Sequence, residues 1–211
     1  MKPLIVRWGT QDVLMAQEVI DLNEYDLPDK FEKEDRILDV GAHIGCFAWA
    51  CRARGSERIE CYEPDSENVK LLRTNIGESC CVFPNAVWSS SGQDLMLQRD
   101  PVRTAMSTVG VPLFDWHGPI VQSVSLGQAI GKRPVRLLKL DCEGSEVPIL
   151  EAASAEDLAF VQEIVGELHY KLTGISDYWL EQHLKRLGFK TARFRKNKIC
   201  PNLLTLFWGT K

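Results

Sequence analysis

The sequence predicts an α/β fold, in which a mostly parallel sheet carries helices on both of its faces. The first observation behind this prediction is that short apolar runs alternate with amphipathic segments along the chain. This pattern is typical of parallel strands joined by crossover helices. The second observation is a pair of strand-like runs, 190–195 and 203–208, with no helix between them. Strands joined without a crossover helix run antiparallel, so we expect an antiparallel last strand.

Length and composition predict one domain with a sizeable core. The chain has 211 residues, and 45% of them are hydrophobic, which is enough to bury a single core. We expect an N-terminal cap segment over residues 1–35 and the α/β core over residues 36–211. The net charge of −4 argues against nucleic acid or an anionic membrane as the main partner.

Two further features favour a cytoplasmic location. The seven cysteines are scattered without a Cys-x-x-Cys pair, so we expect reduced core thiols rather than a disulfide frame or a zinc site. The N-terminus becomes polar too soon for a signal peptide, and no apolar run approaches the ~20 residues of a membrane span. The oligomeric state is not readable from the sequence.

The N-terminal segment holds two predicted elements. Leu4 to Val6 is expected to form a short edge strand. Apolar residues between Val13 and Ile20 recur at helical spacing and predict a helix capped by Thr10 or Asp12.

The rest of the fold is organised around residues 36–45, which predict a buried strand, a glycine turn and the start of a helix. Ile37, Leu38 and Val40 suit a strand that is covered on both faces. Gly41 and Gly45 bracket the turn, where the backbone must bend sharply and let a ligand approach. The following helix, from residue 46, should end near residue 55.

The later elements follow the same alternation. Aspartate 141 begins an acidic turn after one strand, and Ser145 is expected to cap the helix that follows it. The predicted strands are 58–63, 81–83, 94–98, 121–126, 135–140 and 161–168, and the predicted helices are 65–75, 127–131, 146–153 and 176–187. Residues 99–119 show no periodicity, and we expect a mobile wall over the bound substrate there.

The chemistry of the glycine turn separates two possible cofactors. A dinucleotide site requires Gly-x-Gly-x-x-Gly, whereas Gly41 and Gly45 give Gly-x-x-x-Gly with Asp39 just before them. An unpaired carboxylate there would repel a pyrophosphate and favour the ammonium and sulfonium of S-adenosylmethionine. Glu63 ends the next strand and can accept hydrogen bonds from both ribose hydroxyls, although it would serve NAD equally well.

Three motifs together resemble the FkbM family of S-adenosylmethionine-dependent methyltransferases. Ile37-Leu38-Asp39-Val40-Gly41-Ala42-His43-Ile44-Gly45 is similar to the family's first motif, with His43 in place of the usual Asn. Tyr62-Glu63-Pro64-Asp65-Ser66-Glu67-Asn68 resembles the second, and Leu138-Lys139-Leu140-Asp141-Cys142-Glu143-Gly144-Ser145-Glu146 resembles the third and most specific one. The opening residues 7–12 also look like those of the family.

This resemblance implies the class I methyltransferase fold, which is Rossmann-like and has a seven-stranded, mostly parallel sheet with an antiparallel last strand. It also implies O-methylation of a hydroxyl on a small metabolite, sugar or glycan. The residues that we expect to contact the cofactor are Asp39, Gly41, Ala42, His43, Gly45, Glu63, Pro64, Asn85, Ala86 and Asp141.

An alcohol is a weak nucleophile at neutral pH, so a base is expected beside the reacting methyl group. Asp141 and His169 end neighbouring strands, and both side chains should reach the cleft. We predict that His169 is the base, titrating near pH ~6.5, and that Asp141 positions the acceptor or the methionine moiety.

The sequence also allows a metal site, an oxidoreductase and a non-catalytic module. Asp141, Glu143 and Glu146 have a spacing that could hold a divalent metal, but such groups more often cap a turn, and we expect no metal. An NAD(P)-dependent oxidoreductase is disfavoured by the missing Gly-x-Gly. A non-catalytic module that binds the cofactor is disfavoured because the expected site carboxylates are all present.

Overall fold

The computed structural model describes residues 2–78, 80–99, 107–110, 118–169, 173–197 and 204–211. Its main sheet has seven strands in the order β10-β11-β9-β8-β1-β2-β3. These strands are β1 Arg36–Val40, β2 Arg58–Tyr62, β3 Cys81–Phe83, β8 Val135–Leu140, β9 Val161–Leu168, β10 Thr191–Lys196 and β11 Thr205–Thr210. Strand β11 runs antiparallel to both of its neighbours, and the pairs from β9 to β3 are parallel. The predicted fold is therefore confirmed.

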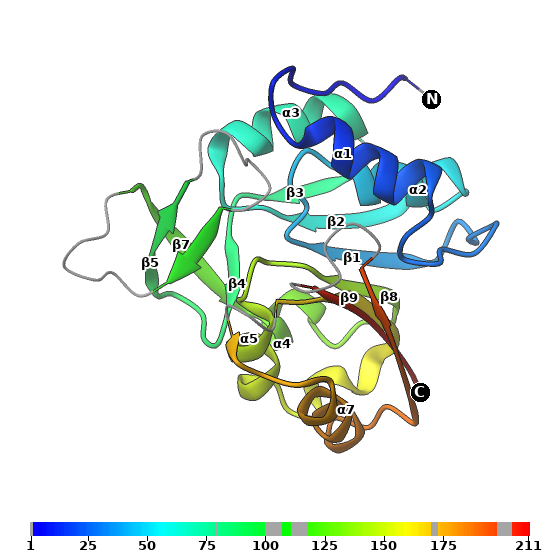
Figure 1. The fold of residues 1–211 in the computed structure, drawn as a ribbon, viewed down its shortest axis with the longest axis vertical. Helices are drawn as coiled ribbons and strands as arrows, with labels where there is room; N and C mark the ends of the chain where they lie inside the picture. Colours follow the sequence, from blue (N-terminus) through cyan, green and yellow to red (C-terminus); the bar gives the residue numbers. More distant parts are fainter. Residues whose placement is uncertain (1, 79, 100–106, 111–117, 170–172, 198–203) are drawn as a thin grey trace.

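Helices cover both faces of this sheet (Figure 1). One face carries α1 Asp12–Ala16, the π-helical turn η1 Gln17–Asp21, α2 Cys46–Ala53 and α3 Ser66–Ile76. The other face carries α4 Leu126–Ile130, α5 Glu146–Ala152, the 3₁₀ turn η3 Asp157–Phe160 and α7 Asp177–Arg186.

Strand β1 contributes to a separate apolar core on each face. Ile37 packs in the cluster that contains α2, whereas Leu38 and Val40 pack in the cluster that contains α4 and α7. All three side chains are at most 1% exposed. Successive side chains of a strand point to opposite faces, so an apolar run is required when both faces are covered.

A second, smaller sheet of four strands lies beside the main one, in the order β4-β7-β5-β6. Its strands are β4 Ala86–Trp88, β5 Asp94–Gln98, β6 Thr108–Gly110 and β7 Ile120–Ser125. The sequence predicted β5 and β7 as strands, and they pair antiparallel. It did not predict β4 and β6, which are short and lack a clear alternation.

Most of the segment predicted to be a mobile wall, 99–119, falls outside the described residues. Thr108 to Gly110 is the described strand within it, and Val109 packs with the small sheet. The wall over the acceptor therefore stays a prediction.

Three local predictions near the N-terminus were wrong. Leu4 to Val6 is not a strand. The expected helix is split into α1 and the π-turn η1, and its N-cap position is Gln11 rather than Asp12. The Thr10 hydroxyl does accept a hydrogen bond from the first helical N–H, that of Asp12, at 3.2 Å. The Asp12 carboxylate instead binds the Arg7 guanidinium, with Nε–Oδ2 at 2.8 Å. This ion pair, between residues five positions apart, takes the Asp12 side chain away from the capping role.

Ser145 also fails to cap α5, because the Glu146 carboxylate satisfies this turn. Glu146 accepts hydrogen bonds from the backbone N–H groups of Cys142 at 2.5 Å and Gly144 at 3.0 Å. A carboxylate in the first turn of a helix is also favoured by the helix dipole.

Among the described residues, six cysteines are free thiols. Cys46, Cys51 and Cys61 are buried as expected, whereas Cys80 and Cys142 are half-buried and Cys81 is exposed, so the expectation of core thiols holds for half of them. The described helices include none that is long and apolar enough to cross a membrane.

Candidate active site

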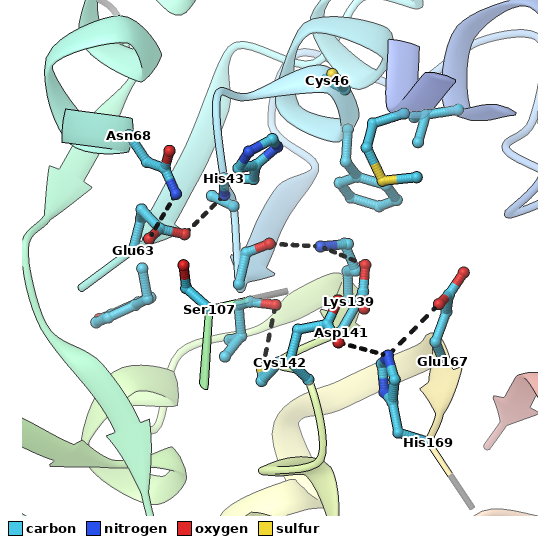
Figure 2. A pocket seen from close by; sticks show the side chains of 18 of the residues that line it. His43, Cys46, Glu63, Asn68, Ser107, Lys139, Asp141, Cys142, Glu167 and His169 are labelled. Atoms are coloured by element: carbon cyan, nitrogen blue, oxygen red, sulfur yellow. Dashed lines mark hydrogen bonds and ion pairs between the residues drawn. The ribbon is translucent and has the colours of Figure 1, made fainter. Parts of the chain in front are cut away.

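A cavity of about 270 Å³ opens at the carboxyl ends of β1, β2, β8 and β9. In an open α/β sheet this edge is where ligands bind. Helix α1 and the turn η1 close the cavity from the N-terminal side. Figure 2 shows Glu63, His43 and Asn68 at one end of the cavity and Asp141, Glu167 and His169 at the other. We call these the β2 end and the β9 end.

At the β2 end, the Glu63 carboxylate is held by three donors. The backbone N–H of His43 donates to Oε2 at 2.8 Å, and the backbone N–H of Asp65 donates to Oε1 at 2.9 Å. The Asn68 side-chain amide donates to Oε1 at 3.3 Å. Burial raises the pKa of Glu63 to about 7, and the hydrogen bonds counteract this rise. The carboxylate is thus fixed at the cavity wall without a cationic partner there, which suits the neutral hydroxyl donors of a ribose.

The two glycines of the β1 turn are required by close packing. A Cβ on Gly41 would lie 1.8 Å from the carbonyl oxygen of Asp141, and a Cβ on Gly45 would lie 2.6 Å from a Leu72 methyl group. Both glycines also have positive φ, at +78° and +92°, a conformation that glycine adopts without strain. From the sequence, we expect these glycines to allow a sharp bend and the approach of a ligand. The structure gives them a packing role.

Lys139 joins the carboxylates of the β1 and β8 strand ends. Its ammonium lies 3.2 Å from Asp39 Oδ1 and 3.5 Å from Asp141 Oδ2, and it donates to the Gly41 carbonyl at 2.8 Å. The Asp39 side chain is fully buried and does not line the cavity. The premise that Asp39 is unpaired was therefore wrong, because Lys139 neutralises it.

Asp141 is more acidic than an ordinary aspartate. Burial alone would raise its pKa, but the charges of Lys139 and His169 and a hydrogen bond from the Tyr25 hydroxyl, at 2.9 Å, lower it below 3.8. Asp141 is therefore ionised at neutral pH. This agrees with the prediction that it is a weak base suited to positioning a ligand.

The N-terminal segment braces the β2 end through Arg7. Its guanidinium donates to Asp12 at 2.8 and 3.0 Å and to the Asn68 side chain at 2.9 Å, and it lies 3.1 Å from His43 Nε2. Burial lowers the pKa of His43 to about 4. The His43 ring is therefore neutral at pH 7.

At the β9 end, His169 is surrounded by carboxylates. Its Nδ1 lies 3.2 Å from Glu146 Oε1, and its Nε2 lies 3.2 Å from Glu143 Oε2 and 3.9 Å from Glu167 Oε2. Glu143 has a φ of +53°, which places a non-glycine residue in the left-handed region beside the site. Such backbone conformations cluster at functional sites.

The expected titration of His169 near pH 6.5 was wrong. Burial alone would lower the pKa of His169, but the carboxylates of Glu146 and Glu143 raise it well above 6.5. The same environment acts on Glu167, where burial and the charge of Asp141 raise the pKa well above 4.5.

Most of the predicted site residues line this one cavity: Gly41, Ala42, His43, Glu63, Pro64, Ala86, Asp141 and His169. Three do not, namely Asp39, Gly45 and Asn85. Asn85 donates instead to the Gln122 carbonyl, at 3.3 Å. The direct cofactor contacts expected from these three residues remain untested predictions.

Polar residues that line the cavity and that sequence reasoning missed include Glu18, Glu24, Tyr25 and Glu167. Glu167 had a usable signal, because it lies two positions before His169 and alternate residues of a strand share a face. The other three come from the N-terminal segment, whose position over the sheet has no local signature.

The chain matches the model of a known protein family. A model of the family described as "Methyltransferase FkbM domain" matches residues 39–191. Among curated proteins, no sequence gives a significant match.

Solved structures share the fold at low sequence identity. A putative S-adenosylmethionine-dependent methyltransferase from Listeria monocytogenes superposes with a TM-score of 0.58 at 9% identity, covering 94% of this chain and 99% of the other. A putative O-methyltransferase from Nostoc punctiforme gives 0.53 at 10% identity, covering 94% and 55%. A putative RNA methyltransferase from Pyrococcus horikoshii gives 0.50 at 14% identity, covering 100% and 92%. At such identities these matches show the fold alone.

Proposed function

Because the chain belongs to the FkbM methyltransferase family and S-adenosylmethionine is its cofactor, we propose that it transfers the methyl group to a hydroxyl of a small metabolite, sugar or glycan. The observation that carries the proposal is that one cavity joins the buried Glu63 carboxylate to the Asp141 and His169 pair. One end suits a ribose, and the other carries groups that can bind and deprotonate an acceptor.

The residues of the β2 end fit the cofactor. Glu63 would accept the ribose hydroxyls, and the apolar wall beside it, made by Pro64, Ala86 and Val87, would cover the adenine ring. The Gly41 turn and Asp141 would flank the methionine moiety. When bound, the cofactor supplies a methyl group that its sulfonium has already activated toward nucleophiles.

The β9 end would bind the acceptor. Asp141 is ionised and held by Lys139 and Tyr25, so it can orient a hydroxyl group by accepting its hydrogen bond. His169 remains the proposed group that takes the hydroxyl proton as the oxygen–methyl bond forms. Its imidazole must first lose the proton that Glu146 and Glu143 stabilise.

Several wider expectations belong to the same proposal. The acidic cavity and the net charge of −4 support a small-molecule or glycan acceptor rather than nucleic acid or a membrane surface. The six described free thiols support a cytoplasmic location.

Binding and product measurements test this function. We expect calorimetry to show binding of S-adenosylmethionine and of its demethylated product, and no comparable binding of NADH. A screen of hydroxylated metabolites and sugars with methyl-labelled cofactor should transfer the label to oxygen. Tight binding of NADH would support the oxidoreductase alternative, and cofactor binding without any labelled product would support the non-catalytic module. Label on nitrogen would contradict O-methylation while keeping the methyltransferase assignment.

A further inference from the structure

We propose that Asp141, Glu167 and His169 form a binding site for a divalent transition-metal ion at the β9 end of the cavity. The proposal deepens the proposed function, on which it rests, because the ion would lie where the acceptor hydroxyl is expected. It revises the expectation from sequence that no metal is bound. It also uses a different set of ligands from the acidic turn considered there, since Glu146 is occupied by its hydrogen bonds to the Cys142 and Gly144 backbone.

The first observation is the distance between the possible ligand atoms. One carboxylate oxygen each from Asp141 and Glu167 and one ring nitrogen of His169 all lie within 4.8 Å of one another. Two ligands of one ion are separated by at most twice the metal–ligand distance, which is about 4–5 Å. The three groups can therefore meet at a single ion with little movement. Figure 2 shows their side chains converging at the same end of the cavity.

The second observation is that Glu167 lacks hydrogen-bond donors among the described residues. It is 9% exposed, and it forms a long ion pair with His169, whose Nε2 lies 3.9 Å from Oε2. Within the described part of the chain, no group donates a hydrogen bond to its carboxylate. A buried carboxylate without donors is costly. The Glu167 carboxylate is therefore explained better as a ligand of a metal ion than as a group that supports the fold.

The third observation is how His169 is oriented. Its Nδ1 faces the Glu146 carboxylate at 3.2 Å, and Glu146 is itself fully buried and anchored by two backbone N–H groups. This leaves Nε2 directed toward Glu143 and Glu167. Histidines that bind metals usually donate their other ring N–H to a carboxylate, which fixes the tautomer and the ring orientation. Glu146 stands in that position, although its 3.2 Å contact with Nδ1 lacks hydrogen-bond geometry in this structure.

The balance of charge in the cavity also favours a cation. Glu24 lines the cavity together with the acidic groups of the β9 end, and among the described residues the cationic groups lining it are Lys139 and, when protonated, His169. Lys139 is already shared between Asp39 and Asp141. A divalent ion would offset the remaining negative charge and replace the charge of the imidazolium proton.

The ligand types narrow the choice of metal. Carboxylates suit Mg²⁺, Ca²⁺ and Mn²⁺, whereas an imidazole ligand favours Mn²⁺, Fe²⁺, Co²⁺ or Zn²⁺ over the first two. Three protein ligands leave coordination positions open for solvent or for an acceptor oxygen. An ion in this position would orient an acceptor hydroxyl and make its proton easier to remove. With the ion bound, His169 would be a ligand, so its proposed role as the base applies to the metal-free site.

Metal titration tests the proposal independently of turnover. Protein stripped with EDTA and exchanged into metal-free buffer is titrated with Mn²⁺, followed by calorimetry and by the electron paramagnetic resonance signal of free Mn²⁺. We expect one site per chain, with Zn²⁺ binding more tightly and Mg²⁺ more weakly than Mn²⁺. Glu167→Gln should weaken Mn²⁺ binding by more than about tenfold. Glu146→Gln, which removes the orienting carboxylate and one acceptor of the turn after β8, should weaken it about 10–100-fold.

Glu18→Gln is the matched control. It removes a carboxylate from the same cavity but outside the three ligands, and it should change the Mn²⁺ affinity by less than about twofold. Circular dichroism confirms that each variant is folded. If Glu167→Gln does not fold, Asp141→Asn replaces it, with the same expected loss. Wild-type protein that binds Mn²⁺ no better than the ligand variants, or a loss in Glu18→Gln equal to theirs, overturns the site.

Cofactor binding separates this proposal from the function on which it rests. S-adenosylmethionine is titrated into the same EDTA-treated protein. If the cofactor binds and labelled product forms at the full rate while Mn²⁺ does not bind, the metal proposal fails and the methyltransferase function stands. If Mn²⁺ binds and the cofactor does not, the metal site stands and the proposed function fails.

Discussion

The buried carboxylates at the two ends of the cavity differ in how many hydrogen-bond donors they have. At the β2 end, Glu63 receives hydrogen bonds from two backbone N–H groups and one side-chain amide. At the β9 end, Glu167 receives none from the described residues, and His169 faces three carboxylates. A carboxylate provided with donors is already in its binding geometry, whereas a group of carboxylates with too few donors is completed by a ligand. The difference predicts that substitutions at the two ends will fail in different ways.

The largest expected effect lies between the two ends, at Lys139. Its ammonium is shared by two buried carboxylates, Asp39 and Asp141, and burial would lower its pKa while these charges raise it. Lys139→Met should lower the free energy of unfolding by about 3–5 kcal/mol, because it leaves the two buried carboxylates without the cation that they share. Urea unfolding at neutral pH measures the loss. Lys70→Met, which removes an exposed pair with Glu67, should cost less than about 0.5 kcal/mol. Equal losses in the two variants would show that Lys139 does not support the site.

At the β9 end we expect a loss of turnover with cofactor binding kept. His169→Ala should lower kcat by ~10²-fold, since it removes the group proposed to accept the proton. Calorimetry should give an unchanged affinity for S-adenosylmethionine. The matched control is His183→Ala, a similarly buried histidine that lies outside the cavity and contacts the Leu150 carbonyl at 2.8 Å. It should lower stability but leave kcat per folded molecule intact. Native turnover in His169→Ala would transfer the role to Asp141 or Glu167.

At the β2 end the expected pattern is reversed. Glu63→Ala should weaken the binding of S-adenosylmethionine about tenfold or more, because a charged hydrogen bond to a buried ligand is worth ~1.5–3 kcal/mol. Glu67→Ala, on the exposed face of α3 close by, should leave the affinity unchanged. An affinity that is the same in both variants would remove Glu63 from the cofactor site.

The smallest effect concerns the pH dependence of stability at the cavity wall. Burial and the charge of Glu24 raise the pKa of Glu18 from 4.5 to about 7. The folded chain therefore binds this proton more tightly than the unfolded chain. The stabilisation that comes from this proton is fully present below pH 4.5 and is lost as the pH rises through about 7. Since glutamine does not ionise, Glu18→Gln should reduce the fall in unfolding free energy between pH 5 and 8 by about 1–2 kcal/mol. Parallel curves for both proteins would contradict the assignment.

The sequence predicted those parts of the site that are local in the chain. The Gly41 turn and the acid at the end of β2 are strand-to-helix connections, where a few neighbouring residues determine the geometry. The seven-stranded sheet followed from the alternation of strands and helices, together with a terminal pair that lacks a crossover.

The charge balance of the site could not be predicted in this way. Whether Asp39 is paired depends on Lys139, which lies on the neighbouring strand β8 and 100 positions later in the sequence. The pKa of His169 depends on Glu143 and Glu146, which come from the turn after β8. Motifs identify which titratable groups are present, but the register of neighbouring strands decides which of them meet.

The N-terminal segment that lines the cavity with Glu24 and Tyr25 has a consequence for the synthesis of the protein. Both residues are held by partners far along the chain: Asn197 donates to the Glu24 carboxylate at 2.8 Å, and the Trp208 indole donates to the Tyr25 carbonyl at 2.8 Å. A ribosome delivers residues 24 and 25 long before the strands that hold them. The hydrogen-bonded group at the β2 end, Glu63 with His43 and Asn68, comes from residues before 69 and can form while β11 is still inside the exit tunnel. The β9 end closes only after β11 pairs with β9, so the nascent chain acquires its cofactor end first and its acceptor end last.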